Sequence, residues 1–475
     1  MSETPIKFGT DGWRGVIAED FTFDNVRICA QGVADYLKQN GLSQRGLVIG
    51  YDTRFASEDF ASAAAEIIAG NNIKVHLCLK PTPTPAVSYT IPAIKAAGAI
   101  IITASHNPSS WNGFKYKSQE GASAPNEVTS QIEKNIAHIT GDKQIKRLAL
   151  NKALKKGLID YLDPIPAYFN HLNQLIDMEE LRRQKLKVIV DPMYGAGTGY
   201  FKLLLQDGNI DLTEINNQRN PAFPGIQPEP IAKNLTELSS LVVKQKANVG
   251  LATDGDADRI GIIDEKGGFL NQHQVFALLC LYLLEVRAER GAMIKTLTST
   301  NMISRLGKIF AVPVYETPVG FKYVAPLMMK ENAIIGGEES GGYGFRGHIP
   351  ERDGILAGLY FLDFMVKTGK MPSQLLDYLY SKVGPHYYER VDFHITKGKR
   401  QKIINRLVSG SVSTIADAKV IAMDTTDGFR FFLADESWLL IRFSGTEPLV
   451  RLYAEGESLE KVRNLLDEGK RLIGI

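Results

Sequence analysis

The sequence predicts an α/β protein made of three successive strand–helix units, followed by an α+β module with an antiparallel sheet. Short apolar strands alternate with helices up to about residue 385, a pattern typical of parallel sheets covered by helices. In each of these three units a strand ends in a polar loop, so we expect a weak structural repeat. Beyond residue 385 the strands follow one another closely. With 475 residues, the chain is long enough for several domains.

The first unit is predicted from apolar runs on either side of a helix. We expect strands at 47–50, 75–79 and 99–102, and a helix over 57–68. The third strand runs directly into Thr-Ala-Ser-His-Asn-Pro, residues 103–108. Ser105 therefore lies just past a strand end, where a sheet presents side chains to a cleft.

Two glycine-containing segments flank this unit. The loop at 8–15 holds three glycines around Arg14, which suits an approach of the backbone to an anion. A tight surface turn is the alternative. Residues 112–115 are expected to form a turn that places Lys115 ten residues after Ser105.

The second and third units repeat the strand-then-loop pattern. We expect strands at 186–191, 248–252, 292–297, 313–315 and 333–335, and a helix over 272–285. The strand at 248–252 ends at Asp254-Gly255-Asp256-Ala257-Asp258-Arg259, and the strand at 333–335 ends at the glycine-rich loop 336–342.

The final module is predicted from about residue 385. Strands are expected at 386–394, 420–423, 429–433, 438–443 and 449–454, with helices over 399–407 and 459–472. Asp427-Gly428 between two of these strands is a hairpin signal.

Composition excludes several function classes. The net charge of +2, without a long basic run, argues against a nucleic-acid partner. The longest apolar run, 275–284, is too short to span a bilayer, and we expect neither a membrane partner nor a signal peptide. The three cysteines, Cys29, Cys78 and Cys280, are far apart, which favours reduced thiols and a cytoplasmic location.

Asp254, Asp256 and Asp258 form the clearest candidate metal site. Three carboxylates so close together repel one another unless a cation lies among them. The spacing resembles the first half of a calcium loop, but the sixth position of such a loop needs glycine and here it is Arg259. We therefore expect Mg²⁺, with a solvated acidic turn as the alternative.

Three further segments suit phosphosugar chemistry. Ser105 is a candidate nucleophile if a base takes its proton, and a serine turn is the alternative. A serine hydrolase is disfavoured, because no G-x-S-x-G elbow surrounds this serine. Glu338 and Ser340 suit recognition of sugar hydroxyls, or else a helix cap. The segment 442–448, Arg-Phe-Ser-Gly-Thr-Glu-Pro, suits a phosphate cradle, or else a hairpin turn.

Together, the loops at 103–108, 254–259, 337–342 and 442–448 resemble the signature loops of the α-D-phosphohexomutase superfamily, of the phosphoglucomutase/phosphomannomutase type. Their order and spacing match from one end of the chain to the other. The resemblance implies three related α/β domains with mixed sheets and a smaller C-terminal α+β domain around a central cleft. We expect these domains at 1–153, 154–265, 266–384 and 385–475.

The resemblance also implies a role for each candidate residue. Ser105 would carry the phosphoryl group, and Asp254, Asp256 and Asp258 would hold Mg²⁺ together with a phosphoserine oxygen. Arg259 would stabilise the transferring group, with His106 or Lys115 as the base. The implied substrate-binding residues are Arg14, Gly320, Lys322, Glu338, Ser340, Arg442, Ser444, Gly445 and Thr446.

The implied activity is a phosphohexomutase of carbohydrate metabolism, an isomerase that interconverts hexose 1-phosphate and hexose 6-phosphate. The reaction would pass through a hexose 1,6-bisphosphate, which also serves as activator. Relatives specific for mannose/glucose or glucosamine usually carry histidine where this chain has Gly342, so we expect glucose. His348, six residues on, is a candidate substitute for that histidine, but we expect it at the surface.

Four alternatives stay open: a hexose 1,6-bisphosphate synthase, a phosphomannomutase, a phosphoglucosamine mutase, or a non-catalytic phosphosugar-binding protein. The sequence carries no signal of an oligomeric state.

Overall fold

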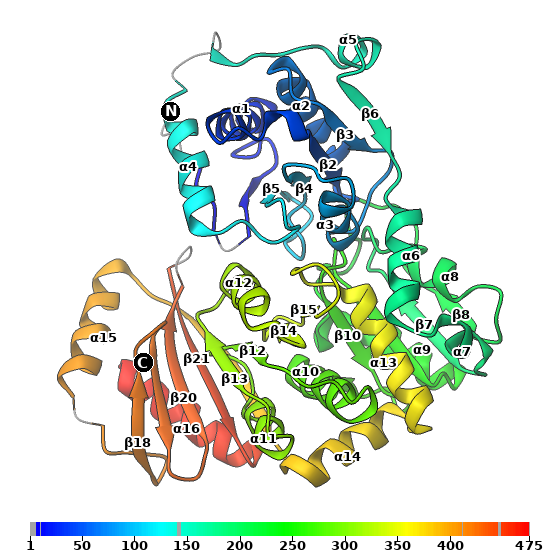
Figure 1. Ribbon diagram of the computed structural model, residues 1–475. Helices are drawn as coiled ribbons and strands as arrows, with labels where there is room; N and C mark the ends of the chain where they lie inside the picture. The colour runs from blue at the N-terminus through cyan, green and yellow to red at the C-terminus, as the bar shows by residue number, and fades with distance from the viewer. Residues whose placement is uncertain (1–5, 10, 140–143, 411, 445–447, 475) are drawn as a thin grey trace.

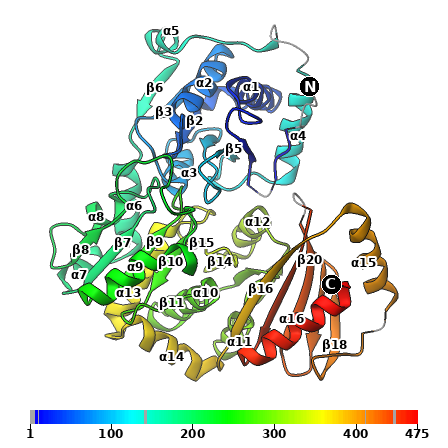
Figure 2. The same ribbon diagram turned by 180° about the vertical axis from the view of Figure 1, so that it is seen from behind.

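The computed structural model describes residues 6–9, 11–139, 144–410, 412–444 and 448–474, which form four sheets (Figures 1 and 2). Three sheets are mixed and carry helices, and the fourth is antiparallel, which confirms the predicted fold class. Figure 1 shows the first sheet at the top, the second at the right, the third in the lower centre and the fourth at the lower left.

The first sheet is built around the strand that leads to Ser105. Its order is β1 (Trp13–Val16), β5 (Trp111–Lys117), β4 (Ala99–Ile102), β2 (Leu47–Tyr51), β3 (Val75–Cys78) and β6 (Ile159–Leu162). The helices of this unit are α1 (Phe23–Gln39), α2 (Ser57–Gly70), α3 (Thr84–Ala93), α4 (Asn126–Ala137) and α5 (Leu150–Lys155). Because β6 pairs with β3, the sheet continues past the domain boundary expected at residue 153.

The turn expected at 112–115 is wrong, because these residues lie inside β5. Gly113 pairs with Arg14 of β1, and Phe114 pairs with Ile102 of β4. Ladders on both sides of β5 thus override the local turn preference of Asn-Gly. The loop at 8–15 likewise enters β1 at Trp13.

The second sheet has the order β11 (Phe269–Leu270), β10 (Ile260–Ile263), β9 (Val249–Thr253), β7 (Lys187–Asp191) and β8 (Asp211–Glu214). Its unit contains α6 (Ile165–Leu175), α7 (Met178–Arg183), α8 (Tyr200–Leu205) and α9 (Thr236–Gln245).

The third sheet has the order β13 (Val314–Thr317), β12 (Met293–Thr296), β14 (Ile335–Gly337) and β15 (Tyr343–Phe345). Its helices are α10 (Gln272–Leu281), α11 (Asn301–Ile309), α12 (Phe321–Glu331), α13 (Gly354–Thr368) and α14 (Pro372–Val383).

The second and third units share one hydrophobic core, to which α10 and α13 contribute most of their side chains. The helix expected over 272–285 begins as predicted at Gln272, where Asn271 and Gln274 form a capping box. It ends in a π-helical turn at Tyr282–Val286. The apolar run 275–284 is fully buried in this core, and no helix of the described ranges is long and apolar enough to cross a membrane.

The fourth sheet is antiparallel and has its own core. Its order is β16 (Tyr387–His394), β21 (Leu449–Gly456), β20 (Trp438–Phe443), β19 (Phe429–Leu433), β18 (Ala418–Asp424) and β17 (Thr414–Ile415), covered by α15 (Lys397–Ser409) and α16 (Leu459–Ile473).

One connection recurs in the first three sheets. A strand that is parallel to a neighbour ends in a polar loop, and the chain then returns as an antiparallel strand: β4 to β5, β9 to β10, and β14 to β15. These three loops hold Ser105, the aspartates and Glu338, so the predicted strand-then-loop repeat is confirmed.

Candidate active site

Ser105 is buried at the end of β4 in a left-handed backbone conformation, with φ of +52°. Its amide donates to Thr103 Oγ1 at 2.8 Å, and the Thr103 hydroxyl donates to Asp52 Oδ2 at 2.6 Å. Because L residues other than glycine adopt this conformation at a cost, the hydrogen bonds around Ser105 must hold it in place.

Arg54 provides the largest share of that support, and sequence reasoning missed it. Its Nη2 atom donates to the carbonyls of Ser105 and Asn107, both at 2.6 Å. Its Nη1 atom donates to the carbonyls of Pro108 at 2.8 Å and Trp111 at 3.0 Å. The signal was available: Asp52-Thr53-Arg54 follows β2 at the same edge of the sheet where the serine loop follows β4.

The serine loop meets the acidic loop of the second unit. Ser105 Oγ donates to Asp254 Oδ2 at 2.6 Å, across 149 residues of chain. A side chain at Gly255 would not fit there, since its Cβ would lie 2.4 Å from the Ser105 carbonyl oxygen. The close approach of the two loops therefore requires glycine at this position.

Asp254, Asp256 and Asp258 are fully buried, and their carboxylate oxygens lie within 4.8 Å of one another. Burial and the charges of Asp256 and Asp258 raise the pKa of Asp254 well above its usual value. One oxygen each of Asp256 and Asp258 is buried without a hydrogen-bond donor. Oxygen ligands gathered in this way, with two oxygens unpaired, fit a divalent cation.

Lys115 connects this triad to the N-terminal loop. Its Nζ lies 2.7 Å from Asp11 Oδ2 and 2.8 Å from Asp256 Oδ2. Burial alone would lower the pKa of Lys115, but Asp11, Asp256 and Asp258 outweigh it and raise that pKa. Burial likewise opposes ionisation of Asp11, yet Lys115, Lys117 and Arg352 hold its pKa well below the usual value.

His106 and two arginines lie near the serine loop. His106 Nδ1 is 3.3 Å from Ser105 Oγ, and burial together with Arg259 and Arg14 lowers the pKa of this imidazole well below its usual value. Arg14 donates to Asn107 Oδ1 at 2.6 Å, and Arg259 lies 3.4 Å from Glu229. The structure thus gathers these residues around the Ser105 loop.

The loop after β14 brings Glu338 into the same network. Glu338 is buried, which raises the pKa of its carboxyl group, and its Oε2 lies 3.4 Å from Arg352 Nη1. The Ser340 hydroxyl is buried without a hydrogen-bond partner, so it remains available to a ligand. Gly342 lies against the Arg352 side chain.

Residues 348–353, between β15 and α13, tie the units together, and sequence reasoning missed this role. Arg352 Nη2 lies 2.9 Å from Asp11 and 2.6 Å from Asp258, and Glu351 pairs with Lys117 at 2.5 Å. A charged run just before an apolar helix was the available signal. The expectation of a surface His348 is wrong: its side chain is fully buried and pairs with Asp353, the residue that caps α13.

The substrate-loop candidates lie at the start of α12. Gly320 precedes the helix with φ of +129°, and Lys322 donates to the carbonyl of Gly9 at 3.3 Å. In the fourth unit, Arg442 pairs with Asp427 at 3.0 Å, and Asp427 also accepts from the Val319 amide at 3.1 Å. Ser444 is buried. The predicted residues Gly445 and Thr446 lie outside the described residues.

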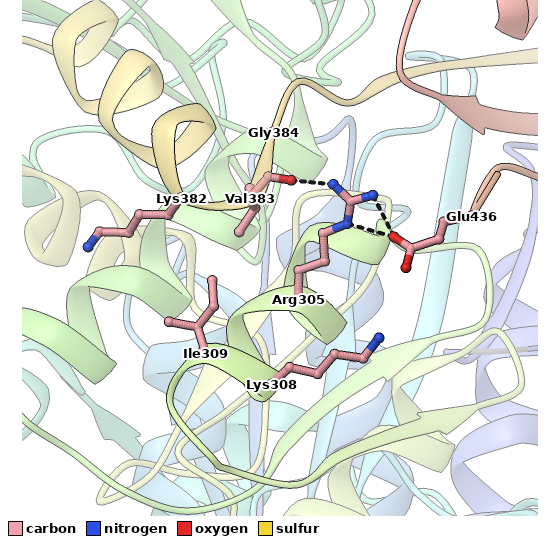
Figure 3. Close-up of a pocket in the computed structure, with 7 residues that line it drawn as sticks. All are labelled: Arg305, Lys308, Ile309, Lys382, Val383, Gly384 and Glu436. Carbon is pink, nitrogen blue, oxygen red and sulfur yellow. Dashed lines mark hydrogen bonds and ion pairs between the residues drawn. The ribbon is translucent and has the colours of Figure 1, made fainter.

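A separate surface pocket contains none of the predicted site residues (Figure 3). It is lined by Arg305, Lys308, Ile309, Lys382, Val383, Gly384 and Glu436. The Arg305 guanidinium donates to Glu436 and to the Val383 carbonyl, as the dashed lines in Figure 3 show. The Arg305 side chain in this pocket is therefore already paired within the protein.

Comparison with known families gives four matches in chain order. All four are described as phosphoglucomutase/phosphomannomutase: alpha/beta/alpha domain I at residues 5–143, domain II at 166–268, domain III at 271–383 and the C-terminal domain at 403–471. They confirm the resemblance drawn from the four loops.

Individual relatives carry different substrate names. A phosphoglucomutase/phosphomannomutase from Thermococcus kodakarensis is 30% identical, with 98% of both chains covered. A probable phosphoglucosamine mutase from Methanosphaera stadtmanae is also 30% identical, covering 98% of this chain and 97% of its own. The crystal structure of a putative phosphomannomutase from Thermus thermophilus is 34% identical, covers both chains fully and superposes with a TM-score of 0.87.

Proposed function

Because the chain belongs to the phosphoglucomutase/phosphomannomutase family, we propose that it interconverts hexose 1-phosphate and hexose 6-phosphate, with glucose as the preferred sugar. The observation that carries this proposal is the 2.6 Å contact between Ser105 Oγ and Asp254. It places a hydroxyl that can carry a phosphoryl group beside carboxylates that can hold a divalent cation.

In the proposed reaction, a sugar hydroxyl attacks the phosphorus of phosphorylated Ser105. The bond from phosphorus to Ser105 Oγ breaks as the bond to the sugar oxygen forms, giving a hexose 1,6-bisphosphate. Asp254, Asp256 and Asp258 would hold Mg²⁺, which when bound supplies positive charge to the phosphoryl oxygens. Arg259 adds a second positive charge. Of the two candidates to take the hydroxyl proton, burial favours the neutral form of His106, whereas ion pairs with Asp11, Asp256 and Asp258 favour the protonated form of Lys115.

The sugar is bound, in this proposal, by residues of the third and fourth units. Glu338 accepts from ring hydroxyls, and the unpaired Ser340 hydroxyl completes the contact. Arg14, Gly320 and Lys322 line the substrate path, and Arg442, Ser444, Gly445 and Thr446 hold the phosphate that is not reacting. The bisphosphate then turns around, so that its other phosphate returns to Ser105.

A substrate panel tests the proposal. Glucose, mannose and glucosamine 1-phosphates are supplied with Mg²⁺, with and without glucose 1,6-bisphosphate as activator, and products are identified by ³¹P NMR. We expect glucose 1-phosphate to give the highest kcat/KM. A higher value for mannose or glucosamine 1-phosphate would replace the glucose assignment by that of a phosphomannomutase or a phosphoglucosamine mutase.

Two further outcomes distinguish the remaining alternatives. Accumulation of the bisphosphate would identify a synthase, and binding of phosphosugars without turnover would identify a binding protein. The cytoplasmic location remains part of this proposal and rests on Cys29, Cys78 and Cys280, which are buried and unpaired.

A further inference from the structure

Arg352 fills the space beside Gly342. A Cβ atom at position 342 would lie 2.3 Å from Arg352 Cδ and 2.9 Å from Cγ, distances at which one side chain must move. Gly342 and the observed position of Arg352 therefore depend on each other.

Carboxylates surround the Arg352 guanidinium and fix it. Its Nη2 atom lies 2.6 Å from Asp258 and 2.9 Å from Asp11, and its Nη1 atom lies 3.4 Å from Glu338. The Phe321 ring covers the guanidinium at 5.7 Å. Because a guanidinium stays protonated in proteins, Glu338 keeps a permanent positive charge beside it.

We propose that Arg352 sets the sugar specificity, because its positive charge beside Glu338 makes the site favour a hydroxyl over an ammonium group on the sugar. The proposal rests on the function proposed above, in which Glu338 contacts the ring. A buried carboxylate without a paired cation would attract the ammonium of glucosamine phosphate. With Arg352 in place, the same ammonium would meet a like charge at close range.

The charge of Arg352 is tested by two substitutions. Arg352→Gln removes the charge and Arg352→Lys retains it. The measured quantity is kcat/KM for glucosamine 1-phosphate divided by that for glucose 1-phosphate. We expect this ratio to rise about tenfold in Arg352→Gln, as the removal of one nearby charge predicts, and to stay unchanged in Arg352→Lys. Arg305→Gln, in the pocket of Figure 3, is the matched control and should leave the ratio unchanged.

Gly342→Ala gives an independent test in which Arg352 keeps its guanidinium but must change its position. The added methyl group must displace Arg352, so the ratio should rise as in Arg352→Gln. Gly398→Ala is the control, because a Cβ there meets nothing within 4 Å. A ratio that stays at the wild-type value in both Arg352→Gln and Gly342→Ala overturns the proposal.

The unmodified protein keeps the proposal testable even if those variants do not fold. At pH 6, where the amine of glucosamine 6-phosphate is protonated, this compound should inhibit or bind about tenfold more weakly than glucose 6-phosphate. Equal binding of the two compounds would overturn the role of Arg352. Absence of turnover with every hexose 1-phosphate would instead contradict the proposed mutase function. Equal binding of the two 6-phosphates would still overturn the role of Arg352 in that case.

Discussion

The Nη2 atom of Arg54 lies 2.6 Å from the carbonyl oxygen of Ser105, and both residues are almost completely buried. The same guanidinium is 3.2 Å from Asp52, which also accepts from the Thr103 hydroxyl, and that hydroxyl in turn accepts from the Ser105 amide. The conformation of the serine is therefore held from both sides, through its carbonyl and its amide. Because Arg54 acts on the serine through these backbone contacts, we regard it as a positioning residue.

Replacement of Arg54 by leucine should destabilise the protein and lower kcat. The change leaves four carbonyl groups without their donor and Asp52 as an unpaired buried carboxylate, which costs about 3–5 kcal/mol in the free energy of unfolding. Arg54→Lys should recover only part of both losses, because a lysine cannot supply the planar fork of donors. Urea unfolding and steady-state kinetics measure the two effects. Arg183→Leu, at an exposed side chain, is the control, and an equal effect there would contradict the role of Arg54.

Ser105→Ala should lower kcat at least about a thousandfold, as expected when a nucleophile is removed, while leaving the fold intact. Mass spectrometry of peptides from active protein should find a phosphate on Ser105. Ser110→Ala, an exposed serine of the same segment, is the matched control and should retain activity. An active Ser105→Ala enzyme, or a phosphate found only on other residues, would reject the assignment.

Chelation should abolish activity, and Mg²⁺ should restore it. Mg²⁺ should also raise the free energy of unfolding by about 2.7 kcal/mol when its concentration is a hundred times its dissociation constant. In Asp256→Asn the triad loses one charged ligand, so this stabilisation should largely disappear. Asp207→Asn, at an exposed position, should behave like wild type. If Mg²⁺ stabilised Asp256→Asn as much as wild type, the cation would not bind at the aspartate triad.

The sequence predicted which motifs at strand ends the structure brings together in the candidate site. Ser105, the three aspartates and Glu338 each follow a strand directly, so local pattern and position in the sheet agree. The alternation of strands and helices likewise predicted the fold class. The apolar run 275–284 was correctly predicted to be buried and too short for a membrane.

The remaining parts depend on contacts between units, which no local pattern shows. Asp11, Arg54 and Arg352 have their roles because they contact residues of other loops, which lie far away in the sequence. The turn expected at 112–115 became part of β5 because β1 and β4 both pair with it. His348 was expected at the surface, yet its side chain is buried, paired with Asp353 and stacked on the ring of His171.

His171 of α6 lies in a stack of rings that joins the first three units. Its ring is parallel to Tyr89 of α3 at 4.5 Å and to His348 at 5.0 Å. Burial and the neighbouring His348 lower the pKa of His171 from its usual value to about 4, although Asp353 acts in the opposite direction. The folded protein thus resists protonation of this ring.

Stability should consequently fall as the pH is lowered from about 7 to about 4. In that range the unfolded chain, whose histidine has a pKa of about 6.5, takes up a proton that folded His171 does not. His171→Phe keeps an aromatic ring in the stack but removes the proton site. Its loss of unfolding free energy between pH 7 and pH 5 should be smaller than that of wild type by about 1 kcal/mol, a value that allows for the partial exposure of the ring. Urea unfolding at the two pH values measures this difference. His138→Phe, at an exposed side chain at the end of α4, is the control and should show the pH dependence of wild type. If His171→Phe also showed the pH dependence of wild type, the stack would not disfavour the charged imidazole.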